Sequence, residues 1–408
     1  MPSNLLYQIK KPYHLLKTGL LTALPAIIKF RFPASKLKII AITGTDGKTT
    51  TTTLLYHILK AAGKKVALIS TVAAYIGDQE IETGLHVTTP EPDKLQELMA
   101  RMVKEKIEYL VLEFTSHGAY QSRLFGLKPK ITGVTNITHE HLDYHINYQN
   151  YLEAKLSFLK KAKTVVLNRD DQSFFRLKRY LPTRSHRILA YGLDDMLPKN
   201  ITLAIKHRFP EIYNQSNARL AITIARFLKC DKTAIASAIS QFPGVPGRMQ
   251  SIPNKKGLEV IVDFAHTPQA LSEALTALRH KLNRTNKRGK LIAVFGCAGL
   301  RDRAKRPMMG KIGVELADLA VFTAEDPRTE DIWTIVREMK EQLTTGHDRI
   351  VTITDRKIAI EFALTKLAKK GDIVGIFGKG PEKSMCYGTT ETPWSDVAVV
   401  QACLTKNT

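Results

Sequence analysis

The stretch that decides the fold is KLKIIAITGTDGKTTTTTLLYHIL, residues 36–59. A run of β-branched residues leads into a turn with two glycines and one lysine, and threonines then open an amphipathic helical pattern. Strand, glycine-bearing turn and helix are the parts of a phosphate-binding loop. The spacing differs from the common G-x-x-x-x-G-K-[ST] pattern, because Ile42 stands five residues before Gly47. The stretch therefore predicts a shorter phosphate loop, G-T-D-G-K-T.

Each residue type in this loop has a chemical use. The glycines let backbone N–H groups approach phosphate oxygens, and the helix that follows points its positive end at the same place. Lys48 supplies a cation for the β- and γ-phosphates, and the Thr49 hydroxyl is placed to bind Mg²⁺. We therefore expect ATP and Mg²⁺ as ligands. The residues expected to contact ATP here are Gly44, Thr45, Gly47, Lys48, Thr49 and Thr50.

From the opening strand onward, short β-branched runs alternate with helical stretches, which predicts the α/β class with parallel sheets. The runs of the first half are KIIAITG, KVALIST, YLVLEFT, ITGVTNIT and TVVLNRD. Prolines and glycines cluster in QFPGVPGR, residues 241–248, as in a linker. The alternation restarts with LEVIVDFAH, KLIAVFGCAG, LAVFTAED, RIVTITD and DIVGIFGKG. We expect a basic apolar segment over residues 1–35, a central ATP-binding domain over 36–245 and a C-terminal domain over 246–408.

Composition narrows the class of protein. Four cysteines in 408 residues form no C-x-x-C pair, which argues against a disulfide framework and a zinc site and fits a reducing cytosol. The formal net charge of +23 at pH 7 suits a nucleic-acid-binding or regulatory ATPase. The sequence contains no recognisable nucleic-acid-binding module, so we favour a cytoplasmic monomer that binds anionic small substrates and no nucleic acid.

The N-terminal segment is basic and apolar. No Asp or Glu precedes Asp46, and LLKTGLLTALPAIIKF, residues 15–30, is broken by Lys17 and Pro25 and is too short to span a bilayer. No convincing signal-peptide cleavage site follows it. Two readings stay open: a helix in weak contact with a membrane surface, or an amphipathic helix packed on the first domain.

A second group of polar residues lies in NITHEHLDYHINYQNYLEAKLSF, residues 136–158. Side chains that can bind a metal lie within seven residues of one another, and Lys155 follows on the next helical stretch. These side chains are His139, His141, Asp143 and His145. The same composition suits a solvated loop, so the residues alone leave both alternatives open.

Glu113 ends the apolar run in YLVLEFTSHGAYQSR, residues 109–123. A carboxylate at a strand end beside a phosphate loop is well placed to hold Mg²⁺. The alternative is a strand-end acid that faces water. It is weakened by the polar residues that follow at once: Thr115, Ser116, His117, Gln121 and Arg123.

Ten segments in fixed order resemble the Mur ligase family. They are G-T-D-G-K-T, HVTTPEP, LEFTSHGAYQSR, TNITHEHLDYH, YLEAK, PGRMQ, VDFAHTPQAL, FGCAGLRDRAKRP, EDPRTE and GKGPE, and the resemblance runs from about residue 37 to the C-terminus. It implies a P-loop-type central ATPase domain and a Rossmann-like C-terminal domain. It also implies ATP-dependent amide ligation through an acyl phosphate in peptidoglycan precursor synthesis. The nearest members add a diamino acid to a muramoyl-L-Ala-D-Glu acceptor.

The resemblance assigns catalytic and metal-binding roles. Lys48 and Thr49 would bind the ATP phosphates and one Mg²⁺, with Glu113 as a further ligand. His141 would bind the other Mg²⁺, and Lys155 would correspond to a carbamylated lysine. Carbamylation turns an ammonium into a carboxylate, which removes the electrostatic conflict of a lysine beside metal ligands.

The resemblance also implies binding residues for the nucleotide and both substrates. Beyond the loop, the ATP-binding residues would be Asn214, Asn217, Arg248, Asp263, His266 and Thr267. The muramoyl dipeptide would contact Thr88, Thr89, Thr115, Gln121 and Arg123. The diamino acid would contact Arg301, Asp326, Arg328, Gly378 and Glu382. Arginine at position 328 is typical of members that add meso-diaminopimelate, because it grips the distal carboxylate.

Three departures from the family pattern bear on the substrates. Asp326 replaces an asparagine and Pro381 a histidine in the amino-acid pocket, and Glu211 replaces a glycine before the N-x-x-N pair. About 35 residues precede the first strand, where the family carries a UDP-binding domain. A lipid-linked or glutamyl acceptor therefore stays open beside the UDP-linked one.

Overall fold

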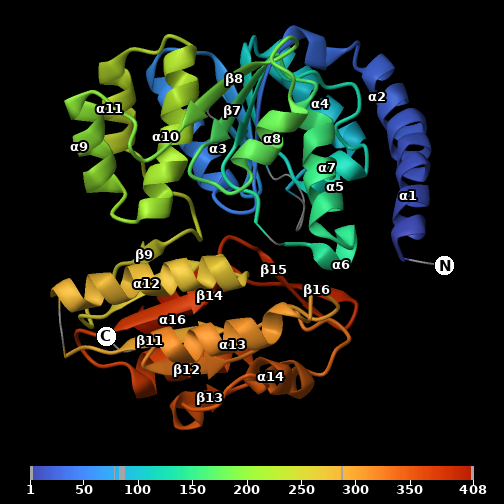
Figure 1. Ribbon diagram of the computed structural model, residues 1–408. Helices are drawn as coiled ribbons and strands as arrows, with labels where there is room; N and C mark the ends of the chain where they lie inside the picture. The colour runs from blue at the N-terminus through green and yellow to red at the C-terminus, as the bar shows by residue number, and fades with distance from the viewer. Residues whose placement is uncertain (1–2, 78, 82–87, 139, 286–287, 406–408) are drawn as a thin grey trace. The chain divides into compact units, whose positions relative to one another are not determined.

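The computed structural model describes residues 3–77, 79–81, 88–138, 140–285 and 288–405 (Figure 1). Contacts between residues divide the chain into two compact units, Met1–Pro243 (unit 1) and Gly244–Thr408 (unit 2). Each unit contains a largely parallel sheet with helices packed against it, so the predicted α/β class is confirmed.

Unit 1 is built on an eight-stranded sheet in the order β4-β3-β2-β5-β1-β6-β7-β8. Its strands are β1 (Lys38–Thr43), β2 (Val66–Ile69), β3 (Ala74–Ile76), β4 (Gln79–Ile81), β5 (Tyr109–Glu113), β6 (Ile131–Val134), β7 (Thr164–Asn168) and β8 (Arg187–Tyr191). Only the β2–β3 and β3–β4 pairs are antiparallel. Strand β1 is central, with Ile40 opposite both Val111 and Ile131. The carboxyl ends of β1 and β5 therefore lie side by side, where open α/β sheets bind ligands.

Helices cover this sheet on both faces, which explains why β1, β2, β5 and β6 are almost wholly buried. They are α1 (Ser3–His14), the π-helix η1 (Leu15–Ala23), α2 (Leu24–Lys29), the 3-10 helix η2 (Pro33–Lys36), α3 (Lys48–Ala61), α4 (Pro92–Lys104), α5 (Ser116–Tyr120), α6 (Leu142–His145), α7 (Tyr148–Leu159), α8 (Phe174–Tyr180), α9 (Lys199–Arg208), α10 (Ile212–Phe227) and α11 (Lys232–Ser240).

Unit 2 has a six-stranded sheet in the order β13-β12-β11-β14-β10-β9 and a separate β15–β16 hairpin. The strands are β9 (Gln250–Ile252), β10 (Glu259–Asp263), β11 (Leu291–Phe295), β12 (Leu319–Phe322), β13 (Ile350–Thr352), β14 (Ile373–Phe377), β15 (Ser384–Tyr387) and β16 (Thr390–Pro393). The helices are α12 (Pro268–Thr285), α13 (Lys305–Leu316), α14 (Ile332–Lys340), η3 (His347–Arg349), α15 (Arg356–Phe362), η4 (Ala363–Leu367) and α16 (Asp396–Thr405). Within the six-stranded sheet only β9 is antiparallel to its neighbour.

The N-terminal helices run along one flank of unit 1 (Figure 1). Gly19 and Ile27 face the turn after α5, because a Cβ at Gly19 would lie 3.1 Å from Phe125 and one at Gly126 would lie 2.4 Å from Ile27. Tyr7 stacks on Tyr120, with ring centroids 4.4 Å apart. Among the described residues, no helix combines the length and apolar character that crossing a membrane requires.

Candidate active site

The phosphate loop joins the end of β1 to the start of α3. Gly47 has a φ of 77°, in the left-handed region that favours glycine. A Cβ there would lie 2.1 Å from Asn217 Oδ1, and one at Gly44 would lie 1.7 Å from Thr135 Oγ1. Both positions therefore need glycine, because a side chain would collide with a neighbouring residue. Gly47 packs against α10 at Asn217, which is one of the residues predicted to bind the nucleotide.

Two lysines converge on this loop. Lys48 Nζ donates to the carbonyls of Thr45 at 2.6 Å and Gly44 at 3.2 Å. Lys155 Nζ reaches the same Gly44 carbonyl at 2.8 Å and lies 3.3 Å from Thr43 Oγ1. Lys48 therefore brings positive charge to the place where an anionic phosphate chain would lie, and the Lys155 amine lies beside it.

Lys155 is buried, with an exposed fraction of 1%. Burial, and then repulsion by Lys48, lowers the pKa of the Lys155 amine well below its usual range. Its Nζ lies 4.7 Å from the centre of the Tyr151 ring. A neutral amine is the form that reacts with CO₂, so this environment suits the carbamate that the sequence predicted.

Glu113 is fully buried at the end of β5, beside the loop. Its Oε1 accepts hydrogen bonds from Thr49 at 3.1 Å and from Thr71 at 2.9 Å. The Thr71 backbone N–H donates to Oε2 at 3.0 Å, and Thr88 Oγ1 lies 3.0 Å from Thr71 Oγ1. The alternative of a strand-end acid facing water is therefore wrong. Thr71, which links Glu113 to Thr88, is a site residue that the sequence reasoning missed.

Asn136 is a second missed residue. Its Oδ1 accepts hydrogen bonds from the backbone N–H groups of Thr45 at 3.1 Å and Asp46 at 2.9 Å. Thr45 Oγ1 also lies 3.0 Å from Tyr151 Oη. Asn136 and Tyr151 thus fix the position of the phosphate loop through hydrogen bonds to Thr45 and Asp46. Thr50, half-buried in the first turn of α3, completes the predicted loop set.

The structure describes two histidines of the predicted cluster, His141 and His145. His139 and the side chain of Asp143 lie outside the described residues. His145 is buried, with Nδ1 2.7 Å from Tyr7 Oη and Nε2 3.0 Å from Ser116 Oγ. His141 is strained at a φ of 55°, and its Nε2 lies 3.6 Å from Glu140 Oε1.

The donor set near the loop fits a magnesium ion in part. Thr49 and Glu113 supply a hydroxyl and a carboxylate, the oxygen ligands that Mg²⁺ prefers. Lys155 suits the same ion only as a carbamate, because an ammonium offers no lone pair. Within the described part of the chain, no three His, Cys, Asp or Glu side chains converge as a metal site.

The residues predicted to hold the acceptor lie together. The Thr115 backbone N–H donates to Thr89 Oγ1 at 3.2 Å, and Arg123 Nη1 donates to the Thr89 carbonyl at 3.0 Å. Arg123 Nε donates to Gln121 Oε1 at 2.9 Å, and Gln121 in turn donates to Tyr144 Oη. Thr89, Thr115, Gln121 and Arg123 therefore form one polar network near the end of β5, and Thr88, next to Thr89 in the chain, bonds separately to Thr71.

Asn214 and Asn217 lie one turn apart on α10, and both are buried. Asn217 Nδ2 donates to Asn214 Oδ1 at 3.4 Å, and Asn214 Nδ2 donates to Glu211 Oε2 at 3.2 Å. Glu211, the departure from the family glycine, therefore orients the asparagine pair from the start of the helix.

In unit 2, the predicted nucleotide residues gather after β10. Asp263 accepts from the backbone N–H groups of Met249 at 2.7 Å and Ala265 at 2.8 Å. The Arg248 guanidinium lies 4.4 Å from the centre of the Phe264 ring, and the His266 ring lies against the same ring. Thr267 Oγ1 accepts from Ala270 N at 3.2 Å in the first turn of α12.

The predicted amino-acid residues of unit 2 meet around Lys379, which the sequence reasoning missed. Lys379 is buried, with Nζ 2.8 Å from Asp326 Oδ1 and paired with Glu382. Arg328 Nη1 donates to the Gly299 carbonyl at 2.8 Å, and its Nη2 lies 4.0 Å from Asp326 Oδ2. Lys379, more than Arg328, therefore neutralises Asp326.

The backbone is strained at two residues of the cluster around Lys379. Asp326 and Arg328 have φ values of 42° and 53°, which cost energy in residues with a side chain. Gly378 has a φ of 109°, and a Cβ there would lie 2.5 Å from Glu325 Oε2. Arg301 lies two residues after Gly299 and is exposed; among the described residues, no hydrogen bond or ion pair links it to this cluster.

The sequence matches two family models. One, described as the Mur ligase middle domain, covers residues 42–225, and the other, the Mur ligase glutamate ligase domain, covers residues 247–380. A curated relative from Clostridium botulinum is 37% identical over 372 residues, which cover 86% of this chain and 74% of the relative. The chain belongs to the Mur ligase family. It is therefore an ATP-dependent ligase that joins an acid to an amino acid.

Two curated relatives of this Mur ligase carry the same name. The Clostridium botulinum protein and one from Geobacillus thermodenitrificans are both named UDP-N-acetylmuramoyl-L-alanyl-D-glutamate–2,6-diaminopimelate ligase. The second is 34% identical over 402 residues, which cover 91% of this chain and 80% of the relative.

Solved structures show the same architecture. A structure of a UDP-N-acetylmuramoyl-L-alanyl-D-glutamate–2,6-diaminopimelate ligase has a TM-score of 0.57 at 30% identity, with 93% of this chain and 81% of that chain covered. Mycobacterium tuberculosis folylpolyglutamate synthase, solved with ADP and AMPPCP, has a TM-score of 0.70 at 17% identity, with 92% and 96% covered. The second likeness concerns the fold alone.

Proposed function

We propose that this Mur ligase joins meso-diaminopimelate to a muramoyl-L-Ala-D-Glu acceptor in peptidoglycan precursor synthesis, with ATP as the energy source. The observation that carries the proposal is the convergence of Lys48 and Lys155 on the Gly44 carbonyl beside the buried pair of Thr49 and Glu113. It occurs in a chain 37% identical to a relative named for this reaction.

In the proposed reaction, an acceptor carboxylate oxygen attacks the γ-phosphorus of ATP, and ADP leaves. The amine of the diamino acid then attacks the acyl phosphate carbon, phosphate leaves, and the nitrogen loses a proton. Two anions must meet in the first step, so positive charge at the phosphate loop lowers its barrier. Thr49 and Glu113 would hold one Mg²⁺, and His141 and a carbamate on Lys155 would also serve as metal ligands. The bound metal would neutralise further phosphate charge.

The acceptor is proposed to lie on the network of Thr89, Thr115, Gln121 and Arg123. Arg123 is the cation of that network, and it is already held by Gln121, the Thr89 carbonyl and Glu91. An arginine fixed in this way presents its remaining N–H groups to a carboxylate at little entropic cost. Thr88, the neighbour of Thr89 in the chain, bonds to Thr71, and Thr71 and Thr49 both donate to Glu113 beside the phosphate loop.

The diamino acid is proposed to bind in unit 2 beside Arg328. The Asp326 carboxylate pairs with Lys379 at 2.8 Å, whereas Arg328 Nη2 lies 4.0 Å from Asp326 Oδ2. Asp326 therefore neutralises little of the Arg328 charge. A guanidinium of this kind favours a ligand with a carboxylate, as the distal end of meso-diaminopimelate provides. L-Lysine would place an ammonium there instead.

A second candidate keeps the chemistry and changes the carrier of the acceptor. A lipid-linked muramoyl peptide would present the same dipeptide to Arg123 without UDP recognition, and a glutamyl acceptor would present only a carboxylate.

The proposed reaction takes place in the cytoplasm. All four cysteines of the chain are free, which suits that reducing compartment.

The test is ADP release measured with ATP and Mg²⁺ in the presence and absence of each substrate. We expect release to require both the muramoyl dipeptide and meso-diaminopimelate. Running the assay with UDP-linked, lipid-linked and free dipeptide identifies the carrier. ADP release that depends on neither substrate, or that responds only to nucleic acid, would contradict the ligase proposal.

A further inference from the structure

The N-terminal helices bury one face on unit 1 and expose an apolar stripe on the other. Six exposed apolar side chains recur every three or four residues from α1 to α2, the spacing of a single helix face. This exposed N-terminal face consists of Ile9, Tyr13, Leu16, Leu20, Leu24 and Ile28, and Leu21 beside it is 67% exposed.

The opposite face already has its partner. Tyr7, Gly19, Ala23, Ala26 and Ile27 are buried against unit 1. The helices are therefore held in one orientation by packing, and the exposed N-terminal face is a fixed surface of the protein. A contiguous apolar surface of this kind marks an interaction site in soluble domains.

Charge indicates what the surface binds. Acidic residues are absent from the sequence before Asp46. The basic side chains on and beside the stripe are all exposed: Lys10, Lys11, Lys17, Lys29, Arg31 and Lys36. Apolar side chains rimmed by cations suit a bilayer with anionic headgroups, in which the apolar groups enter the acyl boundary and the cations meet phosphates.

We propose that the exposed N-terminal face docks on an anionic phospholipid bilayer. Docking is peripheral, because within the described part of the chain no helix can cross a membrane. A second copy of the chain is a poorer partner, since pairing two such faces would bring two sets of six cations together. The inference does not depend on which acceptor the ligase uses.

The experiment is co-sedimentation of the full-length protein with large vesicles. One set contains phosphatidylglycerol mixed with phosphatidylcholine, and the other contains phosphatidylcholine alone. We expect binding to the first set at low salt, falling as salt rises because screening shortens the reach of the lysines. Binding to phosphatidylcholine alone should be much weaker.

Two variants separate the apolar and the electrostatic contributions. Leu20→Glu combined with Leu24→Glu places anions in the stripe and should weaken binding by at least about tenfold. Replacing Lys10, Lys11 and Lys17 by serine should weaken it on the order of 100-fold, because each basic residue near the surface contributes a factor of about five.

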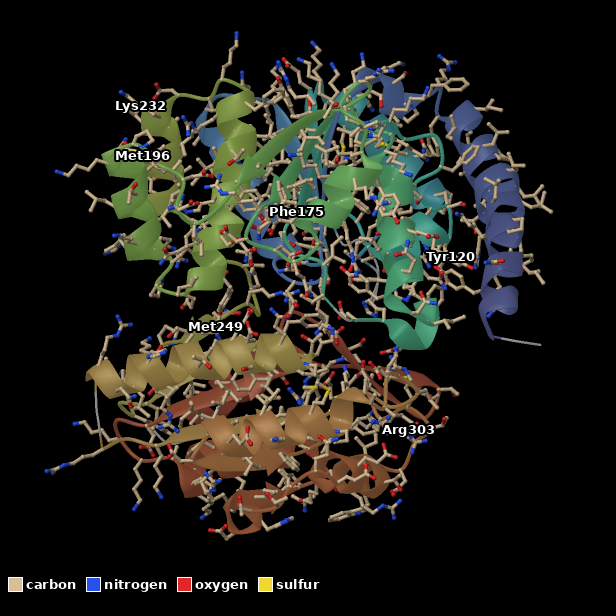
Figure 2. All side chains as sticks on the ribbon, viewed as in Figure 1. Tyr120, Phe175, Met196, Lys232, Met249 and Arg303 are labelled. Carbon is tan, nitrogen blue, oxygen red and sulfur yellow. The ribbon has the colours of Figure 1, made fainter. Side chains whose placement is uncertain are left out.

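A matched control lies elsewhere in unit 1. Met196 is 95% exposed and, with the exposed Leu203 of α9, offers the same apolar-to-Glu exchange away from the stripe (Figure 2). The double variant Met196→Glu, Leu203→Glu should sediment with vesicles as the unchanged protein does. Circular dichroism and thermal melting check that all variants are folded.

Three results would overturn the proposal. The first is full-length protein that ignores phosphatidylglycerol vesicles at low salt. The second is equal vesicle binding by the leucine variant and its control. The third is a lipid-free dimer, seen by light scattering, that the leucine substitutions convert to a monomer, because the face would then cover a second copy.

Discussion

Lys155 is a buried amine, and burial and then repulsion by the Lys48 cation lower its pKa well below the usual range. We predict that Lys155→Ala lowers amide formation by at least about 100-fold, because it removes the group that would become the carbamate. Excess bicarbonate with a short carboxylate added in trans should restore part of the rate. Amide formation is followed by ADP release and by mass spectrometry of the product.

Lys160, exposed just after α7, gives the control. Lys160→Ala should keep full activity and the same melting temperature. Labelled bicarbonate should give a carbamate carbon signal in the unchanged protein and in Lys160→Ala, and none in Lys155→Ala. Full activity of Lys155→Ala would rule out the carbamate role.

Arg328 should set the choice between two diamino acids. We predict that meso-diaminopimelate is preferred over L-lysine by about 2 kcal/mol or more, roughly 30-fold in kcat/KM, because lysine leaves the guanidinium without an anion. Arg328→Ala should remove most of this preference, whereas Arg284→Ala, at an exposed position of α12, should leave it unchanged. Side-by-side turnover decides the matter, and equal use of L-lysine by the unchanged protein refutes the arginine argument.

At the residue scale, the sequence motifs named most of the side chains that make up the candidate site. Lys48, Lys155, Glu113 and the residues predicted for the acceptor were all named from motifs; Lys48, Lys155 and Glu113 lie close to the phosphate loop, and the roles of all these residues stay predictions. Thr71, Asn136 and Lys379 were missed because their contacts join segments far apart in the chain: Thr71 meets Glu113, Asn136 meets Thr45, and Lys379 meets Asp326. No local spacing signals such pairs.

The turn that connects β1 to α3 depends on Gly47. We predict that Gly47→Ala weakens ATP binding, because a Cβ would meet Asn217 Oδ1 at 2.1 Å and the loop would have to shift. Strain at the φ of 77° adds a stability loss of about 1–2 kcal/mol. Isothermal titration with ATP and a denaturation curve measure the two effects.

A substitution at Gly63, just after the C-terminal end of α3, separates the effect of backbone strain from the effect of a side-chain collision. Its φ is 71°, but a Cβ there would meet nothing within 4 Å. Gly63→Ala should therefore lose a similar stability and bind ATP as the unchanged protein does. Equal ATP affinity in Gly47→Ala and Gly63→Ala would show that contact with Asn217 is unimportant.

A hydrogen-bond chain runs from Tyr7 of α1 through His145 to Ser116, which follows Thr115 of the predicted acceptor network in the chain. Tyr7→Phe keeps the ring stacked on Tyr120, which is labelled in Figure 2, but leaves a buried histidine nitrogen without its partner. We predict a stability loss of about 1–3 kcal/mol and a raised KM for the acceptor with little change for ATP.

Tyr13→Phe is the matched exchange on the exposed side of the same helix, at a residue that is 53% exposed. It should change neither stability nor the acceptor KM. If Tyr7→Phe lowers stability but leaves the acceptor KM unchanged, the chain only anchors the helix.

The strands show what periodicity can predict. All ten β-branched runs form strands at the expected places, from β1 to β14. The short strands β3, β4, β8, β9, β15 and β16 were not predicted. Strands β3, β4 and β9 have three residues each, too few for an alternating pattern, and β16, TETP, is fully exposed and buries no apolar side chain. For the N-terminal segment, packing on the first domain is confirmed, while contact with a membrane stays a proposal.

For the whole molecule, buried histidines predict sensitivity to acid. Burial lowers the pKa of His145 to about 3, against an ordinary value of 6.5, and burial also lowers the pKa of His57. Because the unfolded chain takes up these protons first, the free energy of unfolding should fall as pH drops from about 6.5 toward 3. Denaturant midpoints across this range give the measurement.

The variant His145→Gln tests the assignment. It cannot titrate, so its stability should depend less on pH below about 6.5 than that of the unchanged protein, although it is less stable at neutral pH. An unchanged slope would mean that other groups cause the acid sensitivity.

The contacts of Tyr7 bear on how the protein can be shortened for experiments. The match to the middle-domain model begins at residue 42, inside β1, so a chain can be trimmed only as far as residue 37; such a chain loses Tyr7 but keeps β1, Tyr120 and His145. The cut would bare an aromatic ring and the buried histidine, a surface prone to aggregation. Low yield or weak turnover of a trimmed chain would then report the missing helix, and an affinity tag is better placed at the other terminus.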